Sequence, residues 1–344
     1  MPIRTGIIGF GLSGRVFHAP FVAANPEFSL DLIATRDPER RALAVSRYPN
    51  TELVDAPSDL LARAGDLDLV VLASPANTHL EQGLSALRAG AAVVVDKPFA
   101  PSASDAEALI AAAAATQRPL IVFQNRRWDG DFLTVKKLIG SGTLGDVVRF
   151  ESTFERWAGP RRPRWQDTTT IAQGAGITFD LGSHLIDQAL QLFGPVQDTH
   201  AELRIVRDKG VSDDDAYVSL LHENGVRSHL TMSSVAAIAG PRFRVLGTAG
   251  TYSVYGLDGQ EVALDSGILP TDERYGMNEP DAFGDVSDGA RRSRVATERG
   301  NYPAFYAGVA TAIRGNGPSP VDPRDALAVV RIIERIHREF PAAS

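Results

Sequence analysis

The first third of the chain alternates short apolar runs with longer segments of helical character. The apolar runs occupy residues 3–8, 30–35, 69–74, 92–95 and 120–123. Candidate helices lie between them at residues 80–89, closed by Gly90, and at residues 104–116. Apolar strands that alternate with helices indicate parallel strands joined by crossover helices. We therefore predict an α/β domain with a doubly wound parallel sheet over residues 1–123.

After residue 124 the pattern changes to longer runs in which apolar and polar positions alternate. A short helix is predicted at residues 132–139, and strands at residues 147–154, 200–206, 216–221, 226–232 and 243–246. Turn signals at Glu223-Asn-Gly225 and Thr248-Ala-Gly250 favour hairpins. Residues 124–344 are thus expected to form an α+β domain with a large, mainly antiparallel open sheet.

Two further parts of this second domain carry expectations. Residues 265–300 are rich in Gly, Asp and Arg and show no period, which predicts a long surface loop or a lid. The chain then closes with predicted helices at residues 302–314 and 323–340. One face of the sheet needs a cover, so we expect self-association through it, as a homodimer or homotetramer.

Composition narrows the possible partners. The 344 residues are 44% hydrophobic and carry a net charge of -7, which disfavours nucleic acid or an anionic membrane and favours a small-molecule ligand. No cysteine is present, which excludes disulfides, thiolate metal sites and cysteine nucleophiles. Neither a secretory leader nor a membrane-spanning apolar stretch is visible, so a cytoplasmic protein is expected.

A glycine-rich segment, Gly9-Phe10-Gly11-Leu12-Ser13-Gly14, follows the first strand directly and leads into a helical stretch over residues 15–24. In that context the glycines allow a tight turn and a close approach to a pyrophosphate at a helix N-terminus. The alternative is an ordinary turn with incidental glycines. We interpret the segment as the phosphate cradle of an NAD(P)-binding Rossmann domain.

The end of the second strand bears on the choice between NAD and NADP. That strand ends in Thr35-Arg36-Asp37. If Thr35 occupies the position of the ribose-binding acid, its hydroxyl and the Arg36 guanidinium suit a 2′-phosphate, which favours NADP. The competing alignment places Asp37 on the ribose and Arg36 over the adenine, which favours NAD.

Two loops at the carboxyl ends of later strands are expected to face the cofactor. The first is Ser74-Pro75-Ala-Asn77-Thr-His79, in which Pro75 locks the loop and Asn77 can contact ribose or nicotinamide, whereas His79 can simply begin the next helix. The second is Asp96-Lys97-Pro98. A lysine fixed by the next proline, immediately after a buried strand, is typical of a site residue rather than a solvated charge.

A pair of titratable residues in the second domain is a candidate for proton handling. Asp180 and His184 are four residues apart, and so share a face if the segment is helical, while Gly182 leaves the space between them open. The alternative is a capping aspartate and a packed histidine. A metal site lacks a third ligand in view, so none is predicted.

These segments, in this order and spacing, resemble the Gfo/Idh/MocA family of NAD(P)-dependent sugar and cyclitol oxidoreductases. The family pattern has a glycine-rich turn, Pro-x-x-x-His, Glu-Lys-Pro and Asp-x-Gly-x-His. This chain departs from it at Asp96, where glutamate is usual, and at Ala175, which interrupts a glycine triplet. The segment from Gly11 to His18 and the Thr35-Arg36 pair are most similar to the NADP-dependent scyllo-inositol dehydrogenase branch.

The resemblance implies hydride transfer between a secondary alcohol and the nicotinamide, with His184 accepting the hydroxyl proton, Lys97 bonding the substrate oxygen and Asp180 holding substrate hydroxyls. Asn125 joins the expected cofactor set and Arg126 the substrate set. The basic, aromatic stretch from Arg156 to Trp165 is either a substrate wall or a surface contact. Two alternatives stay open: an inactive NADP-sensing regulator, and a reductase of another sugar or aldehyde carbonyl.

Overall fold

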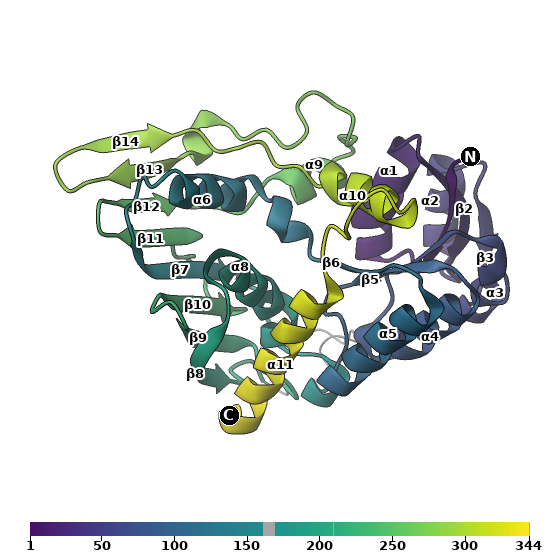
Figure 1. The fold of residues 1–344 in the computed structure, drawn as a ribbon, viewed down its shortest axis with the longest axis horizontal. Coiled ribbons are helices and arrows are strands. Elements are labelled where there is room, and N and C mark those ends of the chain that lie inside the picture. Colours follow the sequence, from purple (N-terminus) through teal and green to yellow (C-terminus); the bar gives the residue numbers. More distant parts are fainter. Residues whose placement is uncertain (161–168, 209, 344) are drawn as a thin grey trace. The chain divides into compact units, whose positions relative to one another are not determined.

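The computed structural model describes residues 1–160, 169–208 and 210–343 of the chain (Figure 1). The chain divides into two compact units, each built from several segments. The first unit holds residues 1–125, 260–275 and 301–327, and the second holds residues 126–259, 276–300 and 328 onward. Two late segments, residues 260–275 and 301–327, therefore belong with the N-terminal sheet.

The first unit is built on a six-stranded parallel sheet. Its strands are β1 (Ile3–Ile8), β2 (Phe28–Ala34), β3 (Glu52–Val54), β4 (Leu69–Leu72), β5 (Ala92–Asp96) and β6 (Leu120–Phe123), in the order β3-β2-β1-β4-β5-β6. The order reverses between β1 and β4, which is the switch point where ligands bind in such sheets. The predicted doubly wound sheet is confirmed.

Helices cover both faces of this sheet. They are α1 (Ala19–Ala24), α2 (Pro38–Arg47), α3 (Pro57–Leu61), α4 (His79–Arg88), α5 (Ala103–Thr116), α9 (Gln260–Asp265) and α10 (Pro303–Ile313). In Figure 1, α4 and α5 run side by side on one face, and α1 lies with α10 on the other. Ser102 begins α5 as its N-cap, because its hydroxyl accepts a bond from the Asp105 amide at 3.1 Å.

The second unit is built on an eight-stranded sheet. Its strands are β7 (Val147–Glu155), β8 (Val196–Arg204), β9 (Asp215–His222), β10 (Arg227–Ser233), β11 (Phe243–Gly247), β12 (Thr251–Val254), β13 (Gly284–Ser287) and β14 (Arg292–Val295). The order is β14-β13-β12-β11-β7-β10-β9-β8, and only the β7–β10 pair among these is parallel. The predicted mainly antiparallel sheet is therefore confirmed.

The expectation of a long surface loop or a lid over residues 265–300 is wrong in part, because β13 and β14 pair within it and extend the sheet. Each strand has four residues and little apolar alternation, so neither produces a detectable period in the sequence. The two strands pair through their backbones, and charged side chains lie along the pair: Asp285 accepts a bond from Arg292 at 2.7 Å and lies 3.7 Å from Arg294.

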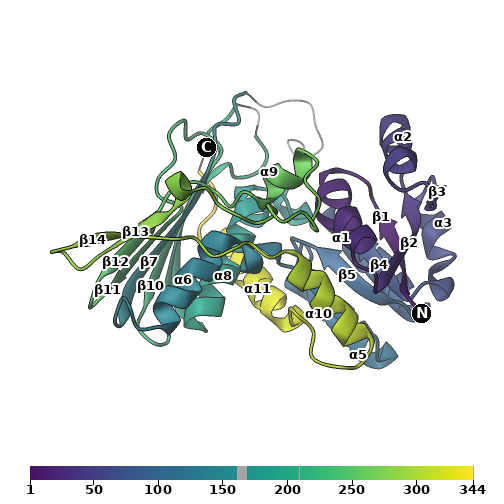
Figure 2. The same cartoon turned by 90° about the horizontal axis from the view of Figure 1, so that it is seen from above.

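The core of the second unit lies between its sheet and three helices, α6 (Gly130–Gly140), α8 (Ser183–Phe193) and the later part of α11 (Pro323–Glu339). Figure 2 shows all three helices on the same side of the sheet. Inward side chains such as Phe150, Leu230 and Phe243 are fully buried, and each contributes about 1.5–3 kcal/mol by leaving water. Alternate residues face outward and are half-exposed.

Candidate active site

The glycine-rich turn of the first unit has no room for a side chain at Gly9 or Gly14. Gly9 has a φ of +96°, and a β-carbon there would meet the Ala73 carbonyl oxygen at 2.5 Å. A β-carbon at Gly14 would overlap the Gly9 carbonyl oxygen. The Ser13 hydroxyl is buried and has no hydrogen-bond partner among the described residues. A tight backbone cradle with an unused hydroxyl fits the phosphates of a dinucleotide.

The helix after this turn opens with wide turns. Residues Ser13–His18 form a π-helical segment, and α1 continues from Ala19. Such segments occur frequently at functional sites. Arg15, on this segment, bonds Asp265 of α9 at 3.1 Å, which fastens the late segment of the first unit beside the cradle.

The end of β2 presents positive charge beside the glycine-rich turn. Thr35 is buried, Arg36 is exposed, and neither Arg36 nor Arg40 forms an ion pair with a described residue. A β-carbon at Gly11 would lie 3.8 Å from Nη1 of Arg40, so that guanidinium stands against the turn. Asp37 caps α2 by accepting the Arg40 amide at 2.9 Å.

His79 ties together the two loops that follow β4 and β5. Its ring is buried at the first residue of α4, with Nε2 2.9 Å from the Ser74 carbonyl oxygen and Nδ1 3.1 Å from that of Phe99. Burial lowers the pKa of His79, although the two carbonyl groups and Asp96 oppose the shift. The predicted helix start is confirmed, and the ring also sets the spacing of the loops that carry Ser74 and Lys97.

Lys97 follows β5 directly and is half-buried. Its amide donates to Oδ1 of the buried Asp96 at 2.8 Å, and the Lys97–Pro98 peptide is cis. Because the backbone is held on both sides of Lys97, its side chain starts from a fixed position at the carboxyl edge of the sheet. This is the edge at which the glycine-rich turn and the Ser74 loop also lie.

A second histidine lies inside the first unit. His18 is fully buried, with Nδ1 2.8 Å from the Tyr306 hydroxyl and its ring 4.4 Å from that of Phe123. Burial lowers the pKa of His18 to about 4, and the nearby Asp96 only partly offsets this. The ring is therefore neutral at physiological pH.

In the second unit, Asp180 and His184 lie on consecutive helical segments. Asp180 belongs to a wide π-helical turn, Thr178–Gly182, and His184 to the first turn of α8. The Asp180 side chain is 47% exposed and accepts a bond from Nη2 of Arg156 at 3.0 Å. His184 is buried, with 3% exposure. The segment is helical as expected, but its first turn is wider than an α-helical turn.

Comparison with known proteins matches both halves of the chain to related models. Residues 3–124 match the oxidoreductase family with an NAD-binding Rossmann fold, and residues 132–253 match the GFO/IDH/MocA C-terminal domain. The oxidoreductase YdgJ of Escherichia coli K12 is 37% identical over 96% of this chain and 94% of its own length. The chain belongs to the Gfo/Idh/MocA family.

Other relatives agree with this family assignment. The protein IolW of Bacillus subtilis strain 168, named scyllo-inositol 2-dehydrogenase (NADP(+)), is 32% identical over 96% of this chain and 92% of its own length. A solved oxidoreductase from Yersinia pestis superposes with a TM-score of 0.88 at 38% identity, over 97% of this chain and 93% of that one. The prediction of an NAD(P)-dependent dehydrogenase is confirmed at this level.

Not every predicted site residue of this Gfo/Idh/MocA enzyme is equally accessible. Asn125 ends the first segment of the first unit and is buried, with 4% exposure. Arg126 is buried in the second unit, where Nη1 lies 3.2 Å from Asp129 and the guanidinium stands 4.8 Å above the ring of Phe154. Their roles toward cofactor and substrate stay predictions. Trp165, with Arg161, Arg162 and Arg164, lies outside the described residues.

A buried ionic group in the second unit went unnoticed in the sequence. Arg242 lies 3.5 Å from Asp131 and donates to Ser152 at 2.7 Å and to Gln188 at 2.9 Å. Burial raises the pKa of Asp131 to about 6, against the opposing charge of Arg242. No spacing links residues 131 and 242, so only the fold brings them together.

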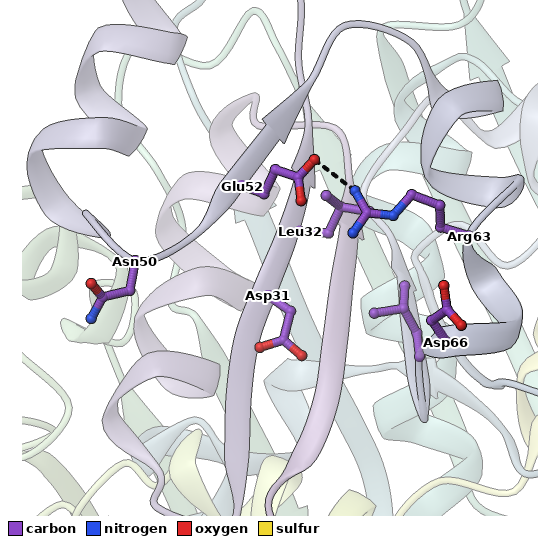
Figure 3. A pocket seen from close by; sticks show the side chains of 7 residues that line it. Asp31, Leu32, Asn50, Glu52, Arg63 and Asp66 are labelled. Carbon is purple, nitrogen blue, oxygen red and sulfur yellow. Dashed lines mark hydrogen bonds and ion pairs between the residues drawn. The ribbon is translucent and has the colours of Figure 1, made fainter.

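A pocket of about 330 Å³ opens at the edge of the first unit, away from these motifs. Figure 3 shows Asp31, Glu52 and Asp66 around it, with Glu52 bonded to Arg63 at 2.7 Å. Asn50, Leu32 and Leu67 complete the lining. It contains none of the predicted cofactor residues.

Metal binding and membrane insertion are two further properties that the described residues bear on. Within residues 1–160, 169–208 and 210–343, no three His, Asp or Glu side chains come together in a way that could hold a metal ion. In the same part of the chain no helix combines the length and the apolar character needed to cross a membrane. The cytoplasmic location stays a prediction.

Proposed function

We propose that this enzyme transfers hydride between a secondary alcohol of a sugar or cyclitol, inositol-like in character, and NADP. The observation that carries the proposal is Lys97, fixed immediately after β5 on the edge that also bears the glycine-rich turn. A half-buried lysine at that edge suits a substrate oxygen on which negative charge develops. Similarity along almost the whole chain to a scyllo-inositol 2-dehydrogenase (NADP(+)) supports the substrate class.

The chain's own residues take four roles in this proposal. The cradle at Gly9 and Gly14 would hold the dinucleotide, which would supply the hydride acceptor. Lys97 donates a hydrogen bond to the reacting oxygen and stabilises the developing alkoxide. His184 accepts the hydroxyl proton through an imidazole nitrogen, a step worth about 10²–10⁴-fold in rate. Asp180 accepts hydrogen bonds from neighbouring substrate hydroxyls.

Arg156 supports the polyol part of the proposal. Its guanidinium pairs with Asp180, and both side chains are about half-exposed (48% and 47%). An exposed arginine–carboxylate pair offers donors and an acceptor side by side, which matches adjacent hydroxyls of a polyol. In the sequence Arg156 was only one member of a basic stretch, and its contact with Asp180 was not foreseen.

The preference for NADP rests on charges that are not neutralised. Thr35 ends β2, and Arg36 and Arg40 lack an ion-pair partner among the described residues. Arg41, by contrast, is engaged by Asp55 at 2.7 Å and by the Thr35 carbonyl at 3.0 Å. Two unpaired guanidinium groups beside a phosphate cradle suit the extra phosphate of NADP.

Alanine substitutions test the cofactor preference. Arg36→Ala and Arg40→Ala should each weaken NADPH binding by about 10–100-fold, as expected for the loss of a charge-assisted bond, and leave NADH binding within about twofold. Arg47→Ala, on the same helix, is the matched control and should change neither. Fluorescence titration gives all the affinities. An equal loss of affinity for NADH and for NADPH would show that these arginines do not recognise the extra phosphate of NADP.

A substrate panel tests the reaction. Oxidation of inositols, aldoses and deoxysugars is followed at 340 nm with NADP and NAD side by side. The Lys97→Ala variant should lose about 10²–10³-fold in kcat and keep its NADPH affinity. Normal turnover in that variant would refute the role proposed for Lys97. Cofactor binding with no turnover of any panel member by the natural chain would instead favour a cofactor sensor.

We extend the proposal to a homodimer or homotetramer formed through the outer face of the eight-stranded sheet. That face is half-exposed and mixes charged pairs, such as Arg244–Glu151 at 3.2 Å, with the Tyr217–His229 ring pair at 5.8 Å. Tyr217→Lys should yield a monomer by light scattering, and Val45→Lys, on the first unit, should not. An unchanged oligomer in the Tyr217 variant would refute this interface.

A further inference from the structure

A buried acid–histidine pair lies behind the wide turn that carries Asp180. Asp213 precedes β9, and His337 stands in the last turn of α11, so the two come from distant parts of the second unit. Nε2 of His337 lies 3.1 Å from Oδ1 of Asp213, and their side chains are 10% and 0% exposed. Neither residue belongs to the set proposed to touch substrate or cofactor.

The second oxygen of Asp213 holds the beginning of the turn. Oδ2 accepts the Thr178 amide at 2.8 Å and the Thr178 hydroxyl at 2.5 Å, and the Asp213 carbonyl accepts the Ile177 amide at 2.8 Å. Burial alone raises the pKa of Asp213, but the bonds from His337 and Thr178 reverse the shift and lower it. The carboxylate is thus ionised and can accept all three side-chain and amide bonds at once.

Close packing fixes both ends of the turn. Gly176 has a φ of +106°, and a β-carbon there would overlap the Asp213 carboxylate. At the other end, a β-carbon at Gly182 would lie 2.8 Å from the sulfur of Met232. Asp180 sits at the middle of this clamped segment, and His184 follows it by one helical turn.

The imidazole of His337 makes no other polar contact with a described residue. Nδ1 of His337 is buried and has no hydrogen-bond partner among the described residues. The ring stacks on Phe179, itself part of the turn, with centroids 5.6 Å apart and planes 18° from parallel. Both contacts of the imidazole therefore lead to the same five-residue turn.

We propose that Asp213 and His337 are positioning residues for the proton-handling pair. Asp213 fixes the start of the turn, and His337 holds that carboxylate and the ring of Phe179 in place. The inference rests on the function proposed above for Asp180 and His184. A displacement of about 1 Å in such groups is enough to slow catalysis about 100-fold.

The experiment compares Asp213→Asn, His337→Leu and His337→Gln with a matched control, His222→Leu. His222 is also a buried histidine of the second unit, bonded to Gly194 at 2.9 Å and Ser228 at 2.8 Å. For each variant, kcat and KM are measured with scyllo-inositol and NADP, NADPH affinity by fluorescence, and Tm by circular dichroism. Amide hydrogen exchange of the peptide spanning residues 176–184 is measured in parallel.

We expect Asp213→Asn and His337→Leu to lower kcat by about 10–100-fold with NADPH affinity unchanged within about twofold. His337→Gln should recover most of the activity, because its amide nitrogen can replace Nε2 toward Asp213. Exchange over residues 176–184 should accelerate at least about tenfold in the first two variants. His222→Leu should lower Tm with little change in kcat or in exchange of this peptide.

The outcomes separate this inference from the proposed function. Normal kcat in Asp213→Asn beside an inactive His184→Ala overturns the positioning role alone. Normal kcat in His184→Ala overturns the proposed function. Equal losses of kcat in His222→Leu and His337→Leu reduce the pair to a general stabilising contact and also overturn the inference. If the enzyme does not turn over scyllo-inositol, amide hydrogen exchange decides the test. An unchanged exchange rate over residues 176–184 in Asp213→Asn would then overturn the positioning role.

Discussion

Replacing His18 with asparagine should make the protein less sensitive to mild acid. The imidazole is fully buried, and among the described residues its one polar contact is Nδ1 to the Tyr306 hydroxyl at 2.8 Å. An asparagine amide can occupy the place of Nδ1 and cannot take up a proton. The smaller side chain leaves a cavity, which lowers stability by an amount that does not depend on pH.

The size of the effect follows from the pKa of His18, which burial lowers from 6.5 to about 4. As the pH falls below 6.5 the unfolded chain binds a proton, whereas the folded protein keeps the ring neutral until about pH 4. Stability is therefore lost across that window, by about 2 kcal/mol between pH 7 and pH 5 and about 3 kcal/mol in full. The variant should lack this loss.

Urea unfolding of the natural protein and of His18→Asn at pH 7 and pH 5, followed by circular dichroism, measures the difference. Comparing the two pH values within each protein cancels the cavity cost. Tyr306→Phe is the control: it removes the hydroxyl but keeps His18 buried, so the acid sensitivity should persist, since burial is the main cause of the shift. If His18→Asn loses as much stability as the natural protein between these pH values, the reasoning is refuted.

Three other substitutions have defined outcomes. Gly14→Ala should weaken NADPH binding at least about tenfold in fluorescence titration, because its β-carbon overlaps the Gly9 carbonyl; unchanged affinity would contradict the cradle. Arg242→Met should lower the free energy of unfolding by about 3–5 kcal/mol, since Asp131 stays buried without its cation. Ser102→Ala should cost about 1 kcal/mol by loss of the α5 cap, with NADPH affinity unchanged.

The central strands β4 and β5 were predictable because each is buried along its whole length and is almost entirely a continuous apolar run. The edge strand β3 was not, since Glu52–Val54 has three residues, begins with an exposed glutamate and has no apolar run of its own. Edge strands are often short and polar, which prevents pairing with other chains. The same composition that protects such an edge hides it from pattern analysis.

The late segments of the first unit were unpredictable for a different reason. The helical period of residues 302–314 indicates a helix but not which sheet it joins. Packing decides this: Tyr306 of α10 stacks on Phe21 with planes 6° from parallel and meets Phe28 of β2 edge-on at 5.6 Å. Aromatic contacts between residues nearly 300 positions apart leave no local signature.

At the candidate site, too, residues in short motifs could be predicted, whereas the groups that hold them in place could not. Lys97 and Asp180 stand in short motifs, so spacing alone drew attention to them. The groups that support them leave no such pattern: the two carbonyl oxygens that hold His79 belong to the backbone and could come from any residue type. Asp213 lies 31 to 35 positions from the turn that it fastens, within a run of three acids that is typical of solvated surface.

Asp96 illustrates how a departure from the family pattern becomes interpretable once the local geometry is known. Its Oδ1 turns back to accept the amide of the next residue, Lys97, at 2.8 Å, a contact that the short side chain of aspartate makes readily. A glutamate carries its carboxylate one methylene farther from that amide. The shorter acid therefore couples its charge to the backbone of the lysine loop, and the same charge acts on the buried rings of His18 and His79. One carboxylate thus acts on the lysine loop and on both histidines of the first unit. An aspartate in place of the family's glutamate therefore keeps the charge but changes the contacts.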